Sequence, residues 1–143
     1  MIENLTYKKE EKMNLVLMDR LYSQSGLWVQ SHGCRLKVGL TDGLANELGL
    51  VYSVALPEVG SNAHAGDKSV KVAMPSETIE FESPLAGRVR AVNLSLDKQP
   101  ELLVQDPYGE GWLFEVDPFN WDGDKNALLS PMEFYELQTE DET

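Results

Sequence analysis

Residues 66–87 read GDKSVKVAMPSETIEFESPLAG. Two runs within this stretch, residues 69–73 and 78–82, alternate apolar with polar side chains. A period of two is typical of a strand with one buried face, so we expect a β-hairpin. Pro75 cannot adopt a positive φ, and a type I turn with Pro75 in its second position fits the connection better than a two-residue hairpin turn. Ser76, in the middle of the quoted stretch, is expected at the apex.

The composition fits one globular domain. The chain has 143 residues, of which 42% are hydrophobic and 25% charged, enough for a hydrophobic core. A net charge of −12 without a basic cluster argues against nucleic acid and anionic membranes as partners. The single cysteine, Cys34, cannot form an internal disulfide. The charged first residues, MIENLTYKKEEKM, lack the apolar core of a signal peptide, and no apolar run suits a membrane span, so we expect a cytoplasmic protein.

The rest of the chain predicts short strands with small helices between and after them. Strands are expected at residues 26–30, 35–40, 50–56, 87–93 and 112–116. Helices are expected at residues 41–48, 100–103, 126–129 and 131–137, with Thr41 and Ser130 as N-caps of the first and last. This pattern favours a mainly β fold, as a compact sandwich or flattened barrel. Residues 1–21 are interpreted as a leader, either disordered or a short helix, and residues 22–143 as the domain.

Several short motifs resemble the H protein of the glycine cleavage system, a relative of lipoyl and biotinyl domains. They are VGLTD at residues 38–42, LPEVG at 56–60, SPLAG at 83–87 and DPYGEGW at 106–112. Each motif alone is weakly specific, but their order and spacing, from Tyr22 to about Leu137, are highly specific in combination. The resemblance implies a barrel-sandwich hybrid of the lipoyl/biotinyl type, with short helices that include one at the C-terminus.

The resemblance also implies a carrier rather than an enzyme. In that family, lipoate is attached through an amide to one lysine at a hairpin tip. The lipoyl arm takes an aminomethyl group from a pyridoxal-phosphate-dependent glycine decarboxylase and presents it to a folate-dependent aminomethyltransferase, and a flavin dehydrogenase reoxidises the arm. The family cofactor is therefore lipoate, and the partners that the resemblance implies are enzymes of glycine cleavage or of lipoylation.

The chain departs from the family pattern at the attachment lysine. The family motif is Glu-Ser-Val-Lys-Ala, with the lysine eight residues before the proline of Ser-Pro. Counting back eight residues from Pro84 gives Ser76, and no gap is needed between Gly66 and Gly87. A serine hydroxyl cannot form an amide, and an ester would be a hydrolysable substitute. We therefore expect a homologue without a lipoyl group, and a biotinyl group fails for the same reason.

Lys71 is the alternative attachment site, because residues 69–71 read Ser-Val-Lys, like part of the family motif. However, Lys71 lies five residues before Ser76, inside the predicted strand and on the face opposite its valines. A lysine within a strand has little of the reach that carriage between active sites needs. We therefore interpret Lys71, and likewise Lys68, as solvated strand residues, and keep a carrier with an atypical lysine as the alternative hypothesis.

A second departure lies near the start of the domain, where the family reads His-Glu-Trp and residues 26–28 read Gly-Leu-Trp. The acidic residue of the family helps to hold the amine of the loaded arm, and Leu27 cannot do so. No other motif indicates catalysis or metal binding. His32 and His64 are expected in surface loops without metal-ligand spacing, and Cys34 is expected to be an inert thiol.

Overall fold

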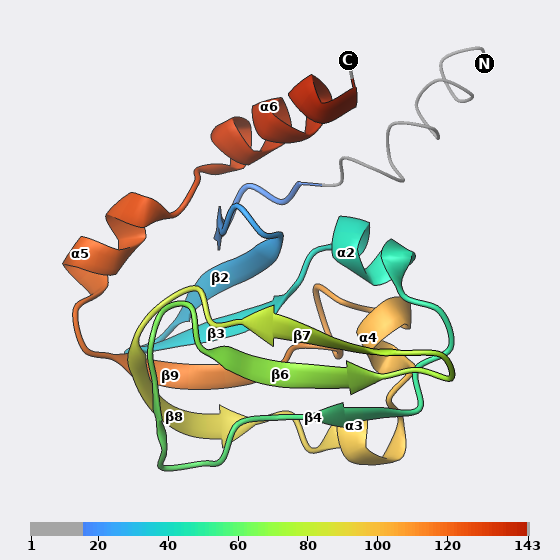
Figure 1. Cartoon of the computed structure of the whole chain (residues 1–143). Coiled ribbons are helices and arrows are strands. Elements are labelled where there is room, and N and C mark those ends of the chain that lie inside the picture. Colours follow the sequence, from blue (N-terminus) through green and yellow to red (C-terminus); the bar gives the residue numbers. More distant parts are fainter. Residues whose placement is uncertain (1–15, 143) are drawn as a thin grey trace.

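The structure is a computed structural model that describes residues 16–142, and it contains two antiparallel sheets (Figure 1). The strands are β1 (Leu21–Tyr22), β2 (Leu27–His32), β3 (Arg35–Leu40), β4 (Ser53–Ala55), β5 (Asn62–Ala63), β6 (Lys68–Ala73), β7 (Thr78–Glu82), β8 (Gly87–Val92) and β9 (Phe114–Pro118). The helices are α2 (Asp42–Glu47), α3 (Ser95–Lys98), α4 (Leu102–Gln105), α5 (Trp121–Asp124), the 3-10 helix η1 (Lys125–Ala127) and α6 (Pro131–Glu142).

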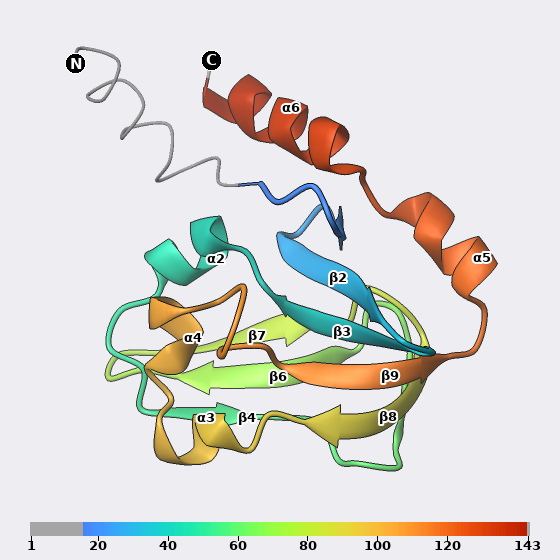
Figure 2. The same cartoon turned by 180° about the vertical axis from the view of Figure 1, so that it is seen from behind.

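The two sheets pack face to face. One sheet has the strand order β1-β2-β3-β9-β8-β5 and the other the order β4-β6-β7, and Figures 1 and 2 show them from opposite sides. Alternate residues of the strands point into the space between the sheets, as a strand period of two requires. The buried residues of this core include Leu36, Val38, Val70, Val72, Phe81, Val89, Phe114 and Val116. The mainly β fold predicted from the sequence is confirmed.

The predicted hairpin is the β6–β7 pair. Val70 and Val72 are buried on one face of β6, and Phe81 is buried on β7, as the alternating pattern predicts. The strands are joined by residues 74–77, and the Met74 N–H donates to the Glu77 carbonyl at 2.9 Å. This four-residue connection agrees with the longer turn predicted from Pro75.

Several element predictions need correction. The strand predicted at residues 50–56 is only Ser53–Ala55, and the helix predicted at residues 126–129 is the 3-10 turn η1. Leu129 instead pairs with Tyr22 of β1. The strands β1 and β5 have two residues each, too short to show a period in the sequence. β1 begins inside the stretch interpreted as the leader, whose first 15 residues lie outside the described part of the chain.

The two predicted N-caps behave differently. The Ser130 hydroxyl accepts from the Glu133 N–H at 3.1 Å, and the Glu133 carboxylate accepts from the Ser130 N–H at 2.9 Å, which is a capping box. Thr41 precedes α2, but its side chain does not cap the helix. Its buried hydroxyl and its backbone N–H both donate to the Gly26 carbonyl, at 2.7 Å and 3.1 Å, so the hydroxyl is engaged away from the helix.

Candidate functional site at the hairpin tip

The connection between β6 and β7 projects at one end of the molecule, beside α2 and α4 (Figure 1). Ser76 lies within this connection and is exposed to solvent. Its neighbours in the turn are Pro75 and Glu77, and the whole turn consists of Met, Pro, Ser and Glu. The tip therefore offers a hydroxyl and a carboxylate to solvent, but no primary amine.

Lys71 lies in the middle of β6, opposite Glu80 of β7 in the strand register. Its Nζ is 3.6 Å from one carboxylate oxygen of Glu80, and Lys68 Nζ is 3.6 Å from the other. Lys71 is on the face opposite Val70 and Val72, as the sequence predicts. The structure thus places Lys71 on the exposed surface of a sheet and Ser76 at its end, so the two candidate residues do not share a site.

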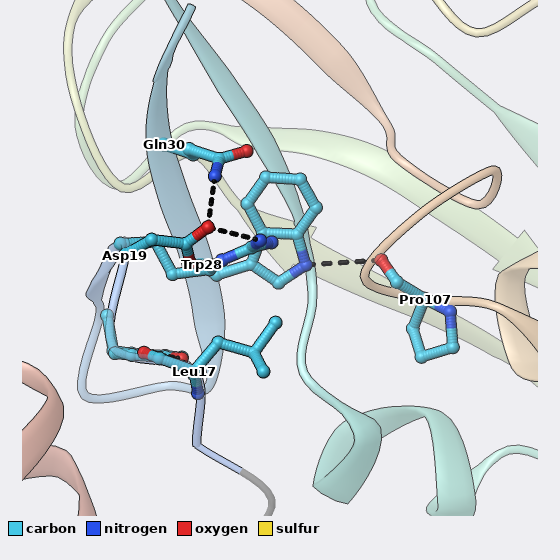
Figure 3. A network of polar contacts seen from close by, with 7 residues as sticks. Leu17, Asp19, Trp28, Gln30 and Pro107 are labelled. Atoms are coloured by element: carbon cyan, nitrogen blue, oxygen red, sulfur yellow. Dashed lines mark hydrogen bonds and ion pairs between the residues drawn. The ribbon is translucent and has the colours of Figure 1, made fainter.

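Leu27 and Trp28 point to opposite faces of β2. Leu27 is buried in the core between the sheets. Trp28 is buried on the other face, where its indole N–H donates to the Pro107 carbonyl at 3.1 Å (Figure 3). The Arg20 guanidinium lies 4.6 Å from the Trp28 ring centroid, a cation–π geometry. Leu27 is thus part of the core and presents no polar group to a bound arm.

The Arg20 side chain is held by a small polar network around Trp28. Arg20 Nε donates to Asp19 at 2.8 Å, and the Gln30 amide donates to the same carboxylate at 2.8 Å (Figure 3). The arginine hydrogen bond is the largest cause that lowers the pKa of Asp19. The network connects the segment before β1 to Trp28 and Gln30 of β2.

Asp42, the first residue of α2, lies next to Tyr108. Burial raises the pKa of Asp42 to about 6, although hydrogen bonds from the Gly43 N–H and the Tyr108 hydroxyl oppose the change. Burial and then the charge of Asp42 raise the pKa of Tyr108. Asp42 Oδ1 is buried and has no hydrogen-bond partner among the described residues. The sequence indicated only that Asp42 begins a helix, because its contact with Tyr108 joins segments far apart in the chain.

Comparison with known proteins identifies the fold. The family model of the glycine cleavage H-protein matches residues 20–141 of this chain. The chain belongs to the glycine cleavage H-protein family. It is similar to a glycine cleavage system H protein of Thermus thermophilus, with 39% identity over 119 residues, 83% of this chain and 92% of the relative. It is also similar to the H protein of Rubrobacter xylanophilus, with 38% identity over 124 residues, 87% of this chain and 95% of the relative.

A solved structure supports the same assignment. The crystal structure of a glycine cleavage system H protein from Mycobacterium marinum superposes with a TM-score of 0.73 at 28% identity, over 85% of this chain and 97% of that chain. Members of the H-protein family carry lipoate, act with the enzymes of glycine cleavage and are not themselves enzymes. None of the helices in residues 16–142 is long and apolar enough to cross a membrane.

The remaining polar candidates of this H-protein homologue lie at the β2–β3 turn and in the β5–β6 loop. His32 ends β2 and lies 4.0 Å from Glu115, a carboxylate that Arg35 and Lys37 also approach. Cys34 is exposed in the adjacent turn, and His64 is exposed between β5 and β6. Within the described residues, no three His, Cys, Asp or Glu side chains are grouped so that they could hold a metal ion.

Proposed function

We propose that this chain is an H-protein homologue that is not lipoylated and acts as a binding or scaffold protein in place of an aminomethyl carrier. The observation that carries this proposal is Ser76, which occupies the exposed hairpin tip and aligns without a gap with the family's attachment lysine. Lipoate is attached through an amide, so a position without a primary amine cannot receive it. We ascribe this function to residues 22–143, in the cytoplasm.

The surroundings of Ser76 support a loss of carrier chemistry without a loss of fold. Next to the tip, β6 and β7 pair in continuous register from Val70–Phe81 to Ala73–Thr78, and Val72 and Phe81 pack in the core. Leu27, where the family has an acidic residue, is buried and cannot hold the amine of a loaded arm. Position 76 thus lacks the amine and position 27 lacks the acidic group that an aminomethyl carrier needs, whereas the two-sheet fold is retained. We propose the enzymes of glycine cleavage or lipoylation as partners.

The alternative is a functional carrier in glycine decarboxylation with lipoate on Lys71. Its side chain is more than half exposed, which keeps the amine accessible. Against this alternative, Lys71 lies within β6 and its ammonium group is 3.6 Å from the Glu80 carboxylate. An exposed ion pair of this kind contributes about 0.2–1 kcal/mol to stability and does not by itself block modification of the lysine. The argument against Lys71 is therefore its place within a strand, which limits the reach of an attached lipoyl arm.

The test is the mass of the purified chain after coexpression with a lipoate ligase and added lipoate. The proposal expects the unmodified mass, whereas the H protein of Thermus thermophilus, expressed in parallel, should gain a lipoyl group. A lipoyl increment on this chain would refute the proposal. If such an increment disappeared in Lys71→Arg, the alternative carrier would be correct.

A further inference from the structure

The outer face of the six-stranded sheet gathers positive charge, although the chain is strongly acidic. Three neighbouring strands, β3, β9 and β8, contain four of the 12 lysines and arginines of the chain but only two of its 24 aspartates and glutamates. Buried residues alternate with the four cations along β3 and β8, so the cations lie on the side of the sheet away from the core. We call this surface the basic face, which consists of Arg35, Lys37, Arg88, Arg90, Glu115 and Asp117.

The two carboxylates of the basic face lie on its central strand, β9, and each is shared between two cations. The side chain of Glu115 is buried, and its carboxylate lies 3.5 Å from Arg35 and 3.8 Å from Lys37. Asp117 accepts a hydrogen bond from Arg90 and lies 4.0 Å from Arg35. These contacts hold the cationic side chains in place, so less conformational entropy is lost when an acidic group binds them.

The carboxylates do not neutralise the whole face. Arg88 is exposed and lies opposite Asp117 in the strand register, but it forms no ion pair with any residue between 16 and 142. The Lys37 ammonium group lies 4.8 Å from the centroid of the Trp112 ring, a cation–π contact that keeps it on the face. Four positive against two negative side chains leave an excess of positive charge here, whereas the whole chain carries −12.

The basic face is accessible to a partner. Figure 2 shows none of the described helices lying across β3, β9 and β8. Beside the turn between β2 and β3, the surface is hollowed by a cavity of about 490 Å³, whose lining includes His32, Cys34, Arg35 and Arg90. This turn and the hairpin tip at residues 74–77 lie at opposite ends of the molecule (Figures 1 and 2), so the basic face is separate from the tip.

We propose that the basic face binds a short acidic segment of a partner protein, whose glutamate or aspartate side chains contact the unpaired Arg88 and the cations beside the cavity. Charge complementarity selects this occupant. A nucleic acid duplex or a second copy of the chain is disfavoured, because either would extend its own negative charge over the acidic surface around the face. This inference goes beyond the proposed function and does not depend on the modification state of the hairpin.

The acidic remainder of the chain does not prevent such binding at physiological salt. The Debye length is about 8 Å at about 0.15 M ionic strength, so charges farther from the bound segment than this are largely screened. A short segment therefore interacts mainly with the basic face. Its affinity should fall when the salt is raised to about 1 M, where the Debye length is only about 3 Å.

The experiment is fluorescence anisotropy of a labelled oligoglutamate peptide titrated with the full chain at about 0.15 M salt. The double variant Arg88→Gln/Arg90→Gln is compared with the control Lys68→Gln/Lys71→Gln, which removes the same charge from the other sheet. We expect the first variant to bind about three- to tenfold more weakly than the unmodified sequence, and the control to bind like the unmodified sequence. Arg88→Gln alone should also lower the affinity, and it leaves every ion pair of the face intact.

Cys34 gives a second measurement that reports the place of binding. It is the single cysteine of the chain, it is exposed, and it lines the cavity beside the basic face. Bound oligoglutamate should therefore slow the alkylation of Cys34 by iodoacetamide, an uncharged reagent whose own approach does not depend on the charge of the face.

Absence of binding, equal weakening in the two double variants, or an unchanged alkylation rate of Cys34 would overturn this inference. So would tighter binding of a DNA duplex than of oligoglutamate, because the occupant would then be nucleic acid. A dimer, detected by light scattering, that Arg88→Gln/Arg90→Gln abolishes would overturn it in favour of a second copy. Thermal unfolding followed by circular dichroism checks that all variants are folded.

Discussion

Ser76 lies in a turn whose backbone geometry does not involve the serine side chain. The turn that presents Ser76 is closed by a backbone hydrogen bond from Met74 to Glu77, and neither group belongs to the serine side chain. The turn therefore does not depend on which side chain stands at its apex. This independence implies that the attachment chemistry could be restored without rebuilding the hairpin.

We predict that Ser76→Lys can be lipoylated. The new side chain would extend into solvent from the exposed turn and would supply the missing amine, with an effect on the free energy of unfolding within about 0.5 kcal/mol. Intact-mass measurement after coexpression with lipoate ligase should show a lipoyl increment on this variant. An unmodified variant, beside a modified H protein from Thermus thermophilus, would contradict this view of the tip.

Asp42 should make stability depend on pH. Its pKa is raised from 3.8 to about 6, so the folded state binds the proton more tightly than the unfolded state. The stabilisation is then complete below about pH 4 and is lost as the pH rises through about 6. The difference corresponds to at most about 3 kcal/mol, which solvent screening of a half-buried carboxylate reduces to about 1 kcal/mol.

We therefore predict that Asp42→Asn is more stable than the unmodified sequence at about pH 8 by about 1 kcal/mol, because it removes a partly buried charge. The difference should fade at about pH 4, where Asp42 is protonated. Urea unfolding of both proteins at the two pH values measures it. A variant that is less stable at the higher pH would show that the carboxylate makes a favourable interaction in its charged form.

The N-caps of α6 and α2 show which contacts can be predicted from the nearby sequence. The capping box of Ser130 and Glu133 lies within one turn of α6, and the sequence predicted the Ser130 cap correctly. Thr41 also occupies the predicted N-cap position of α2, but its hydroxyl bonds the distant Gly26 carbonyl and not a helix N–H. Local signals are thus reliable only where no tertiary partner competes for the side chain.

The cap at α6 gives a prediction for this element. Ser130→Ala should lower the free energy of unfolding by about 1 kcal/mol, since the Glu133 N–H loses its acceptor. Ser130→Asn should retain most of the stability, because asparagine is an equally good cap. Urea unfolding followed by far-ultraviolet circular dichroism compares the two variants, and equal losses would argue against the capping box.

The contact between β2 and β3 depends on Gly39. This glycine pairs with Trp28 across the strands, and a Cβ at position 39 would lie less than 3 Å from the indole ring. Gly39→Ala should therefore destabilise the protein by about 1–3 kcal/mol through overpacking. Gly49→Ala is the control, since open space surrounds that position. Chemical unfolding should separate the two variants, and a Gly39→Ala protein as stable as the control would contradict the packing.

For the whole molecule, the sequence predicted more of the framework than of the surfaces. The period of two in β6 and β7 and the family motifs led to the two-sheet fold and to the position of Ser76. The pairing of Leu129 with β1, the contact of Asp42 with Tyr108 and the gathering of cations on the basic face all depend on which distant segments meet. Such contacts leave no periodic pattern in the sequence, so only the structure reveals them.

At the scale of the whole molecule, we propose a family scaffold whose hairpin carries no lipoyl arm. The net charge of −12 favours partners with basic surfaces. We propose that the hairpin takes part in binding a partner protein and does not carry a group between active sites. The modification state of the hairpin therefore decides between a docking protein and a carrier.

The most direct measurement of that state is mass spectrometry of the chain purified from its native host, as the intact protein and as the peptide that contains the β6–β7 hairpin. We predict that both have unmodified masses, with Lys68, Lys71 and Ser76 all free of lipoate. A lipoyl increment on the hairpin peptide would contradict it and would establish this family member as a carrier.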